Sequence, residues 1–309
     1  MPRYHIAETL PISLPAEEVH AKLSDFRDWP SWSPWTYMEK AVRLEYTEDA
    51  GVAGHGYSWE GDVTGSGSMT LKSTTSSELV MDLDFVKPFK SHAKIRFDVV
   101  AKGDATDVTW HMDGSMPFFL FWMIPTMKAM LGSDFARGLK LFKEHAEEDV
   151  VRSRTEVVGV VDVDTKSFVA VRDTVAVADL GPSMRKTLPQ AFEAASSRGF
   201  TPAGPPMSVI HNFDMKAQRC EYSAAIPVSG EGSVNAPAEK GRIRGCRALK
   251  VVHTGAYEHL SNAWATAKAH QRHLKLKDSK VQGPFEVYMN DPSDTAAEAL
   301  LTEIYLPIR

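Results

Sequence analysis

Four residues near the end of the chain have the types and the spacing to form a binding or catalytic site. They are two glutamates and two tyrosines in residues 285–289 and 302–306, where apolar and polar residues alternate. This alternation predicts two half-buried β-strands. Successive side chains of a strand point to opposite faces, so Glu286 lies beside Tyr288 on one face, and Glu303 beside Tyr305 on another. If the two strands pair, we expect all four side chains to share one patch.

Such a patch suits two kinds of chemistry. Carboxylates and tyrosine rings together bind an organic cation, through charge and through cation–π contact. A buried carboxylate beside a second one also has a raised pKa, which suits general acid–base catalysis. A simpler interpretation is the solvated face of an amphipathic sheet, which antiparallel sheets commonly have.

An internal repeat favours a site over a solvated face. Residues 169–180 (VAVRDTVAVADL) align with residues 249–260 (LKVVHTGAYEHL), about 80 positions later, and 206–212 (PMSVIHN) align with 284–290 (PFEVYMN). Each copy, about 154–228 and 242–309, predicts a strand, a helix and two strands. The four candidate positions align with Ser208, Ile210, Ser223 and Ala225 of the first copy. The second copy has therefore gained two acids and two phenols where the first is small or apolar.

The helix expected in the second copy carries further candidates. Tyr257 and Trp264 fall on the inward stripe of this helix at helical spacing. Trp264 is either a core residue or the wall of a cation site. The predicted ligand-binding set is Glu286, Tyr288, Glu303, Tyr305, Tyr257 and Trp264, and no catalytic residue is assigned.

The first half has the pattern of a sheet held between two helices. Val19, Leu23 and Phe26 form the apolar stripe of an early helix, consecutive strands follow from residue 42 to 113, and residues 117–148 become helical. A helix, an antiparallel sheet and a long helix make an α+β layer pair. Trp29, Trp32 and Trp35 either line a ligand cavity or cap a core, and we expect an apolar cavity beneath the closing helix, whose start (residues 117–131) is strongly apolar.

Length and composition limit the alternatives. The 309 residues carry 43% hydrophobic residues, a formal net charge of −5 and two cysteines. They predict two domains, residues 1–150 and 154–309, in a reducing, cytoplasmic environment, with no direct nucleic-acid partner and no membrane span. The histidines at 253, 259, 270 and 273 match no zinc spacing, so no metal is expected, and no cofactor motif occurs.

The first half resembles the polyketide cyclase/START-like helix-grip family (SRPBCC). The likeness covers residues 1–150 and rests on PAEEV, DWPSWSPW, YSWEGDVTGSGSM and the apolar closing helix. It implies an antiparallel sheet wrapped on a long C-terminal helix, with a cavity for hydrophobic small molecules.

The second half resembles the GyrI-like effector-binding domain, the sensor of certain AraC-type and MerR-type multidrug regulators. The matching segments are HTGAYEHLSNAW, GPFEVYMNDPSDT and LLTEIYLPI, within residues 154–309. The resemblance implies two repeats with a cleft whose acidic and aromatic residues bind lipophilic cations. Some relatives instead hydrolyse small electrophilic compounds with a cleft Glu and Tyr. Because a helix-grip domain stands where regulators carry a helix-turn-helix, we do not expect direct DNA binding.

The leading hypothesis is a small-molecule binding protein that senses or sequesters amphipathic compounds, with cations among them. The alternative is a hydrolase of small electrophilic compounds that uses a cleft Glu and Tyr. A third hypothesis, a protein-interaction module, rests only on the lack of a catalytic motif. Consumption of a test compound separates an enzyme from a binder, while the ligand's identity, the coupling of the two pockets and the oligomeric state stay open.

Overall fold

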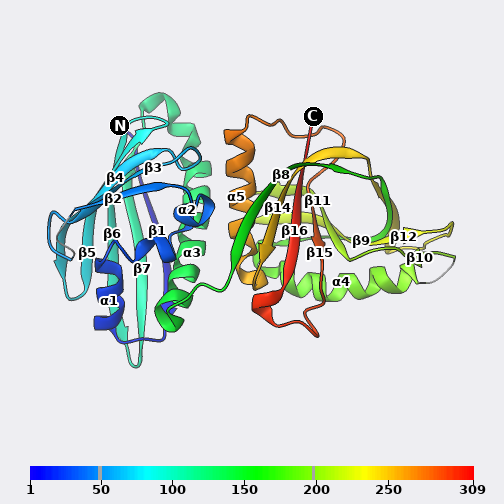
Figure 1. Ribbon diagram of the computed structural model, residues 1–309, viewed down its shortest axis with the longest axis horizontal. Helices are drawn as coiled ribbons and strands as arrows, with labels where there is room; N and C mark the ends of the chain where they lie inside the picture. Colours follow the sequence, from blue (N-terminus) through cyan, green and yellow to red (C-terminus); the bar gives the residue numbers. More distant parts are fainter. Residues whose placement is uncertain (48–50, 197–198) are drawn as a thin grey trace. The chain divides into compact units, whose positions relative to one another are not determined.

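The structure, a computed structural model, describes residues 1–47, 51–196 and 199–309. It divides into two compact units, Met1–Arg152 and Ser153–Arg309 (Figure 1). Each unit combines an antiparallel sheet with helices, which confirms the predicted α+β class.

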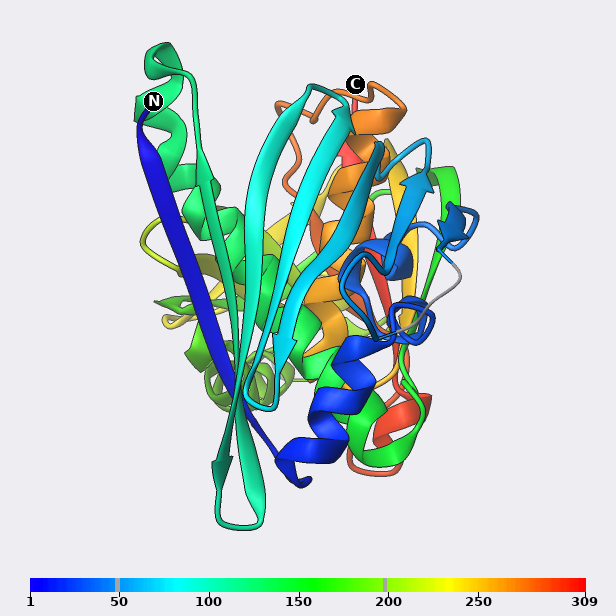
Figure 2. The same ribbon diagram turned by 90° about the vertical axis from the view of Figure 1, so that its left-hand side faces the viewer.

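The first unit is built on a seven-stranded sheet in the order β1-β7-β6-β5-β4-β3-β2. The strands are β1 (Arg3–Ile12), β2 (Arg43–Tyr46), β3 (Gly56–Glu60), β4 (Ser66–Thr75), β5 (Glu78–Lys87), β6 (Ser91–Lys102) and β7 (Ala105–Ser115). Neighbours from β2 to β7 pair antiparallel in chain order, and β1 joins the sheet alongside β7 (Figure 2). This is the predicted meander.

Helices cover one face of this sheet. They are α1 (Ala16–Ser24), α2 (Pro34–Met38) and the long α3 (Ile124–Glu148), with short 3-10 segments η1 (Trp29–Ser31) and η2 (Phe118–Met123). Val19 and Leu23 of α1 and Leu139 of α3 belong to one buried cluster with the inner side chains of the strands. The long closing helix confirms the helix-grip arrangement.

Aromatic rings pack between the sheet and α3. Trp110 of β7 stacks on Phe135 of α3 with ring centroids 4.4 Å apart and planes 4° apart. Trp32 packs edge-on against Trp110 and contacts Phe142 with centroids 4.9 Å apart. All four side chains are less than 2% exposed. These rings fill part of the space between the sheet and α3, and an apolar cavity beneath the closing helix stays a prediction.

The apolar run before α3 does not join this core. Residues 118–123 form η2 instead of the start of a long buried helix, and Phe118 and Trp122 are 76% and 65% exposed. The buried stripe of α3 begins only at Gly132. Within the described ranges, no helix has both the length and the apolar character to cross a membrane.

The second unit is a curved sheet in the order β13-β9-β12-β11-β15-β16-β14-β8, with β10 paired to β12. Its strands are β8 (Arg154–Val163), β9 (Lys166–Ala176), β10 (Thr201–Pro202), β11 (Met207–Asp214), β12 (Arg219–Ser229), β13 (Ala238–Ile243), β14 (Cys246–Thr254), β15 (Phe285–Tyr288) and β16 (Leu301–Ile308). The helices are η3 (Val177–Asp179), α4 (Leu180–Ala195), η4 (Tyr257–His259), α5 (Leu260–His273) and η5 (Ala297–Ala299).

The predicted repeat is confirmed as β9-α4-β11-β12 followed by β14-α5-β15-β16. The two copies meet where β11 pairs with β15, and there Ser208 lies directly opposite Glu286. These two residues occupy equivalent positions in the two copies. An approximate two-fold axis therefore passes between them, at the centre of the sheet.

Each copy also lends a strand to the other. β8, at the start of the first copy, pairs with β14 of the second, and β13, which leads into the second copy, pairs with β9 of the first. Strand pairing buries backbone groups that an isolated copy would leave exposed at an edge. The two copies are thus one folding unit.

We expect fragments 1–152 and 153–309 to fold separately, because each retains its whole sheet and core. A fragment of residues 153–229 should stay unfolded, because it lacks β13 and the β15 partner of β11. Circular dichroism melts of the three fragments measure this. A cooperative transition in 153–229, or none in 153–309, would contradict the expectation.

Candidate functional site

The sheet of the second unit carries the α-helices α4 and α5 on one face, and Glu286 lies between them. Directly paired residues in antiparallel strands point to the same side. One such row runs across the sheet through Val171, Ala224, Ser208, Glu286, Ile304 and Val251. At one end of the row α4 packs over Val171 and Ala224, and at the other α5 packs over Ile304 and Val251. We call this the helix face.

The Glu286 carboxylate is buried and held by two aromatic donors. The Tyr288 hydroxyl donates to Oε2 at 2.6 Å, and the Trp264 indole N–H donates to Oε1. The side chain is only 8% exposed. Burial raises the pKa of Glu286, while the bonds from Tyr288 and Trp264 act in the opposite direction. The carboxyl group therefore takes up a proton more readily than an ordinary glutamate.

Aromatic rings form the surroundings of this carboxylate. Tyr257 meets the Tyr288 ring edge-on with centroids 5.8 Å apart, and it is 38% exposed. Burial, and then the charge of Glu286, raise the pKa of both phenols. Across the described residues, no lysine, arginine or histidine forms an ion pair with Glu286. Glu286, Tyr288, Tyr257 and Trp264 are thus brought together as one cluster, without a neutralising cation.

The prediction that Glu303 and Tyr305 share this patch is wrong. Glu303 lies opposite Val287, and Tyr305 lies opposite Phe285, so both point away from the helix face. The Tyr305 ring stacks on Phe285 with centroids 4.7 Å apart. The two strands are neighbours, as expected, but Glu286 pairs with Ile304 and not with Glu303. A shift of one residue in pairing turns every side chain of a strand to the other face.

Glu303 also has a partner that sequence reasoning missed. The Lys250 ammonium lies 2.7 Å from Glu303 Oε1, and the Tyr305 hydroxyl donates to Oε2 at 2.6 Å. Lys250 comes from β14, opposite Tyr305. Its charge neutralises Glu303, so this carboxylate is less suited than Glu286 to attract a cation.

Ser208 is the other neighbour that the sequence analysis did not assign to the site. It is 3% exposed and adjoins Glu286 across the β11–β15 pairing. The repeat alignment already matched the two positions. Equivalent residues of a two-fold repeat can meet at its axis. The alignment of Ser208 with Glu286 could therefore have placed Ser208 at the site.

Two surface hollows are present elsewhere. One, of about 330 Å³, lies along β3 and β4 and includes Trp59, and the other, of about 280 Å³, lies between α4 and residues 233–238. Neither contains a predicted site residue. In the helix-face cluster, the Trp264 indole N–H instead donates directly to the Glu286 carboxylate.

Two family models match the chain. Residues 3–147 match the polyketide cyclase/dehydrase and lipid transport family, and residues 158–309 match the GyrI-like small molecule binding domain. No curated protein matches the chain significantly.

Several solved structures are similar at low identity. The EcmrR–DNA complex has a TM-score of 0.42 and 17% identity over 62% of this chain and 69% of that one. The EcmrR C-terminal domain has a TM-score of 0.40 and 17% identity over 51% and 98%. MLL2253 from Mesorhizobium loti has a TM-score of 0.38 and 10% identity over 48% and 100%. On the two family matches, the chain is a two-domain protein, with a domain of the polyketide cyclase/dehydrase and lipid transport family followed by a GyrI-like small-molecule binding domain.

Proposed function

We propose that the protein senses or sequesters amphipathic organic cations, and that Glu286 of the GyrI-like domain supplies the counter-charge. The observation that carries this proposal is a buried carboxylate bonded only to aromatic donors among the described residues. Burying a charge without a partner of opposite sign is costly. A bound cation would offset that cost, and this gives the site a preference for positive ligands.

The aromatic neighbours suit the rest of such a ligand. Tyr257 and Tyr288 meet at right angles beside the carboxylate, so a flat apolar cation placed there contacts a ring face and a ring edge. A desolvated cation over an aromatic face is stabilised by about 2 kcal/mol. Amphipathic cations combine a positive charge with an apolar surface that can contact the tyrosine rings. A metal ion or a simple ammonium ion has only the charge.

Entry requires the Trp264 side chain to move. Its indole N–H donates to Oε1 of Glu286, while Tyr257, which contacts Tyr288, is exposed to solvent. We propose that the ligand displaces the indole and stacks on it, and that its charge replaces the lost hydrogen bond. The empty site is then held closed by Trp264.

Titration calorimetry with a lipophilic cation such as tetraphenylphosphonium tests the proposal. The matched control is tetraphenylmethane solubilised in the same cosolvent, which keeps the shape and lacks the charge. Saturable binding of the cation, and much weaker binding of the neutral analogue, is expected. Equal affinities, or no binding across a panel of such cations, would refute it.

Cation affinity should fall as the pH is lowered, because a protonated Glu286 has no charge to offer. Burial raises the pKa of this carboxyl group, so the loss should begin at a higher pH than an ordinary glutamate side chain would give. Dissociation constants measured by calorimetry across the acidic range check this. A constant affinity over that range would mean that another group binds the cation.

The Tyr288–Glu286 hydrogen bond favours one alternative, a hydrolase. A carboxylate with a raised pKa can accept a proton from water, and the adjacent phenol can donate one to the leaving group. In this reading Glu286 is the general base and Tyr288 the general acid, and the substrate is a small electrophilic compound. Chromatography of incubated test compounds separates the two functions, since a binder returns each compound unchanged.

A further inference from the structure

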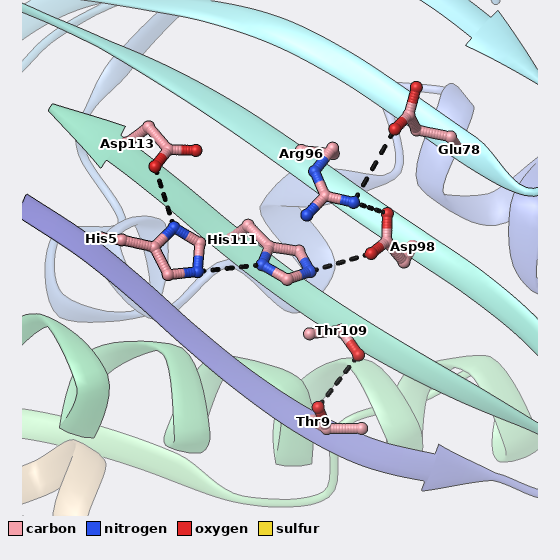
Figure 3. Close-up of polar contacts among 8 residues, drawn as sticks. All are labelled: His5, Thr9, Glu78, Arg96, Asp98, Thr109, His111 and Asp113. Carbon is pink, nitrogen blue, oxygen red and sulfur yellow. Dashed lines mark hydrogen bonds and ion pairs between the residues drawn. The ribbon is translucent and has the colours of Figure 1, made fainter.

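A second cluster of ionisable side chains lies on the outer face of the N-terminal sheet, away from the aromatic core. His5 of β1 is paired with Asp113 of β7, and His111 and Asp113 point to the same face because they are two residues apart (Figure 3). Asp98 of β6 lies on the same face, beside His111. Three adjacent strands thus bring two histidines and two aspartates together.

Each histidine is oriented by a carboxylate. His5 Nδ1 lies 2.9 Å from Asp113 Oδ1, and His111 Nε2 lies 3.0 Å from Asp98 Oδ2. An ionised carboxylate only accepts hydrogen bonds, so the imidazole nitrogen in each contact is the protonated donor. In a neutral imidazole the other nitrogen then carries a lone pair.

The two remaining nitrogens face each other. His5 Nε2 and His111 Nδ1 are 3.4 Å apart, and the ring centroids are 5.3 Å apart, so the rings meet at their edges and are not stacked face to face (Figure 3). With both outer nitrogens donating, neither inner nitrogen has a proton to donate to the other. Two facing lone pairs repel each other, and a shared proton or a bound metal ion relieves that repulsion.

We propose that His5 and His111 together bind a divalent transition-metal ion such as zinc. Two imidazole nitrogens held about 2.0–2.1 Å from a tetrahedral zinc ion lie about 3.3–3.4 Å from each other. The separation of 3.4 Å needs almost no adjustment to reach this value. Metal-bound histidines characteristically donate their second N–H to a carboxylate, which is the role that Asp113 and Asp98 already have.

The local charges and exposure allow an ion to enter. Arg3 of β1 and Lys94 and Arg96 of β6 are cations on this part of the face. Arg96 is paired with Asp98 and Glu78, which offset its charge. The His5 side chain is 50% exposed and that of His111 is 12% exposed, so solvent reaches the site from one side.

The site differs from a structural zinc centre. The described residues contain no group of three or more metal-ligating side chains, so water molecules complete the coordination shell. The inferred ion is therefore exchangeable. Hard ions such as magnesium prefer oxygen ligands and should not bind.

Titration of the full, tag-free, EDTA-treated chain with zinc chloride tests the proposal. Calorimetry should give one saturable site that magnesium chloride does not reproduce. His5→Gln and His111→Gln should each weaken zinc binding at least tenfold, and Asp113→Asn should weaken it by roughly 10- to 100-fold, as partners of metal ligands usually do. The matched control is His92→Gln, because His92 on the same sheet bonds to Asp84 at 2.9 Å and, among the described residues, no second histidine contacts it. It should bind zinc like the unaltered protein.

X-ray absorption of the zinc-loaded, unaltered chain provides a test that no folding defect of a variant can affect. Two imidazoles and light oxygen ligands are the expected shell. A sulfur ligand, more than two imidazoles, zinc affinity unchanged in His5→Gln and His111→Gln, or an equal loss in His92→Gln would overturn the proposal. A pair that only shares a proton would give no saturable zinc binding, which would also overturn it.

Discussion

Glu286→Gln is expected to weaken the binding of a lipophilic cation by about 1–3 kcal/mol, or roughly 5- to 150-fold in Kd. Glutamine keeps the size of the side chain and can still accept the bond from Trp264, but it removes the charge that the ligand would neutralise. A neutral ligand of the same shape should be affected much less. Calorimetry of both ligands with both proteins measures the difference.

Glu303→Gln is the matched control for that change. Glu303 is also a glutamate bonded to a tyrosine two residues away, but it lies on the opposite face and is paired with Lys250. Its substitution should leave cation affinity nearly unchanged. Equal losses in the two variants, or none in Glu286→Gln, would show that the helix-face cluster is not the cation site. If the protein is a hydrolase, Glu286→Gln should instead abolish turnover with binding almost intact.

Trp110→Ala should destabilise the N-terminal domain by about 3–5 kcal/mol, the usual range for removing a large buried aromatic side chain. Trp110 is 1% exposed and contacts Phe135, Phe97 and three other tryptophans, so the neighbouring rings cannot all close the space it leaves. Urea unfolding followed by tryptophan fluorescence suits the measurement, because six of the seven tryptophans lie in residues 1–152.

Trp122→Ala is the control for the core substitution. Trp122 belongs to the same domain but is 65% exposed, so its removal should change stability by no more than about 0.5 kcal/mol. If the two variants lose similar stability, the aromatic core would be looser than the ring contacts indicate. A small loss in Trp110→Ala alone would leave room for a ligand cavity beneath α3.

The sequence determined the order and type of the elements, because local patterns carry that information. The stripe of Val19, Leu23 and Phe26, the uninterrupted strands before residue 113 and the repeat after residue 153 each depend on neighbours in the chain. Val19 and Leu23 of α1 are fully buried, whereas Phe26, which was expected on the same helix, follows its end at Ser24 and is 1% exposed. The pairing of Glu286 with Tyr288 was also predictable, since residues two apart in a strand share a face.

The tertiary structure decided which face each strand turns to its neighbour, how far the core is filled and which distant residues meet. Register depends on the whole loop between β15 and β16, and it placed Glu303 and Tyr305 on the face opposite Glu286. Whether Trp32 and Trp110 line a cavity or fill it depends on volumes contributed by residues distant in the chain, such as Phe142, which contacts Trp32 from 110 positions away. The approach of His5 to His111 likewise requires β1 to close the sheet against β7, a long-range pairing that no local pattern encodes.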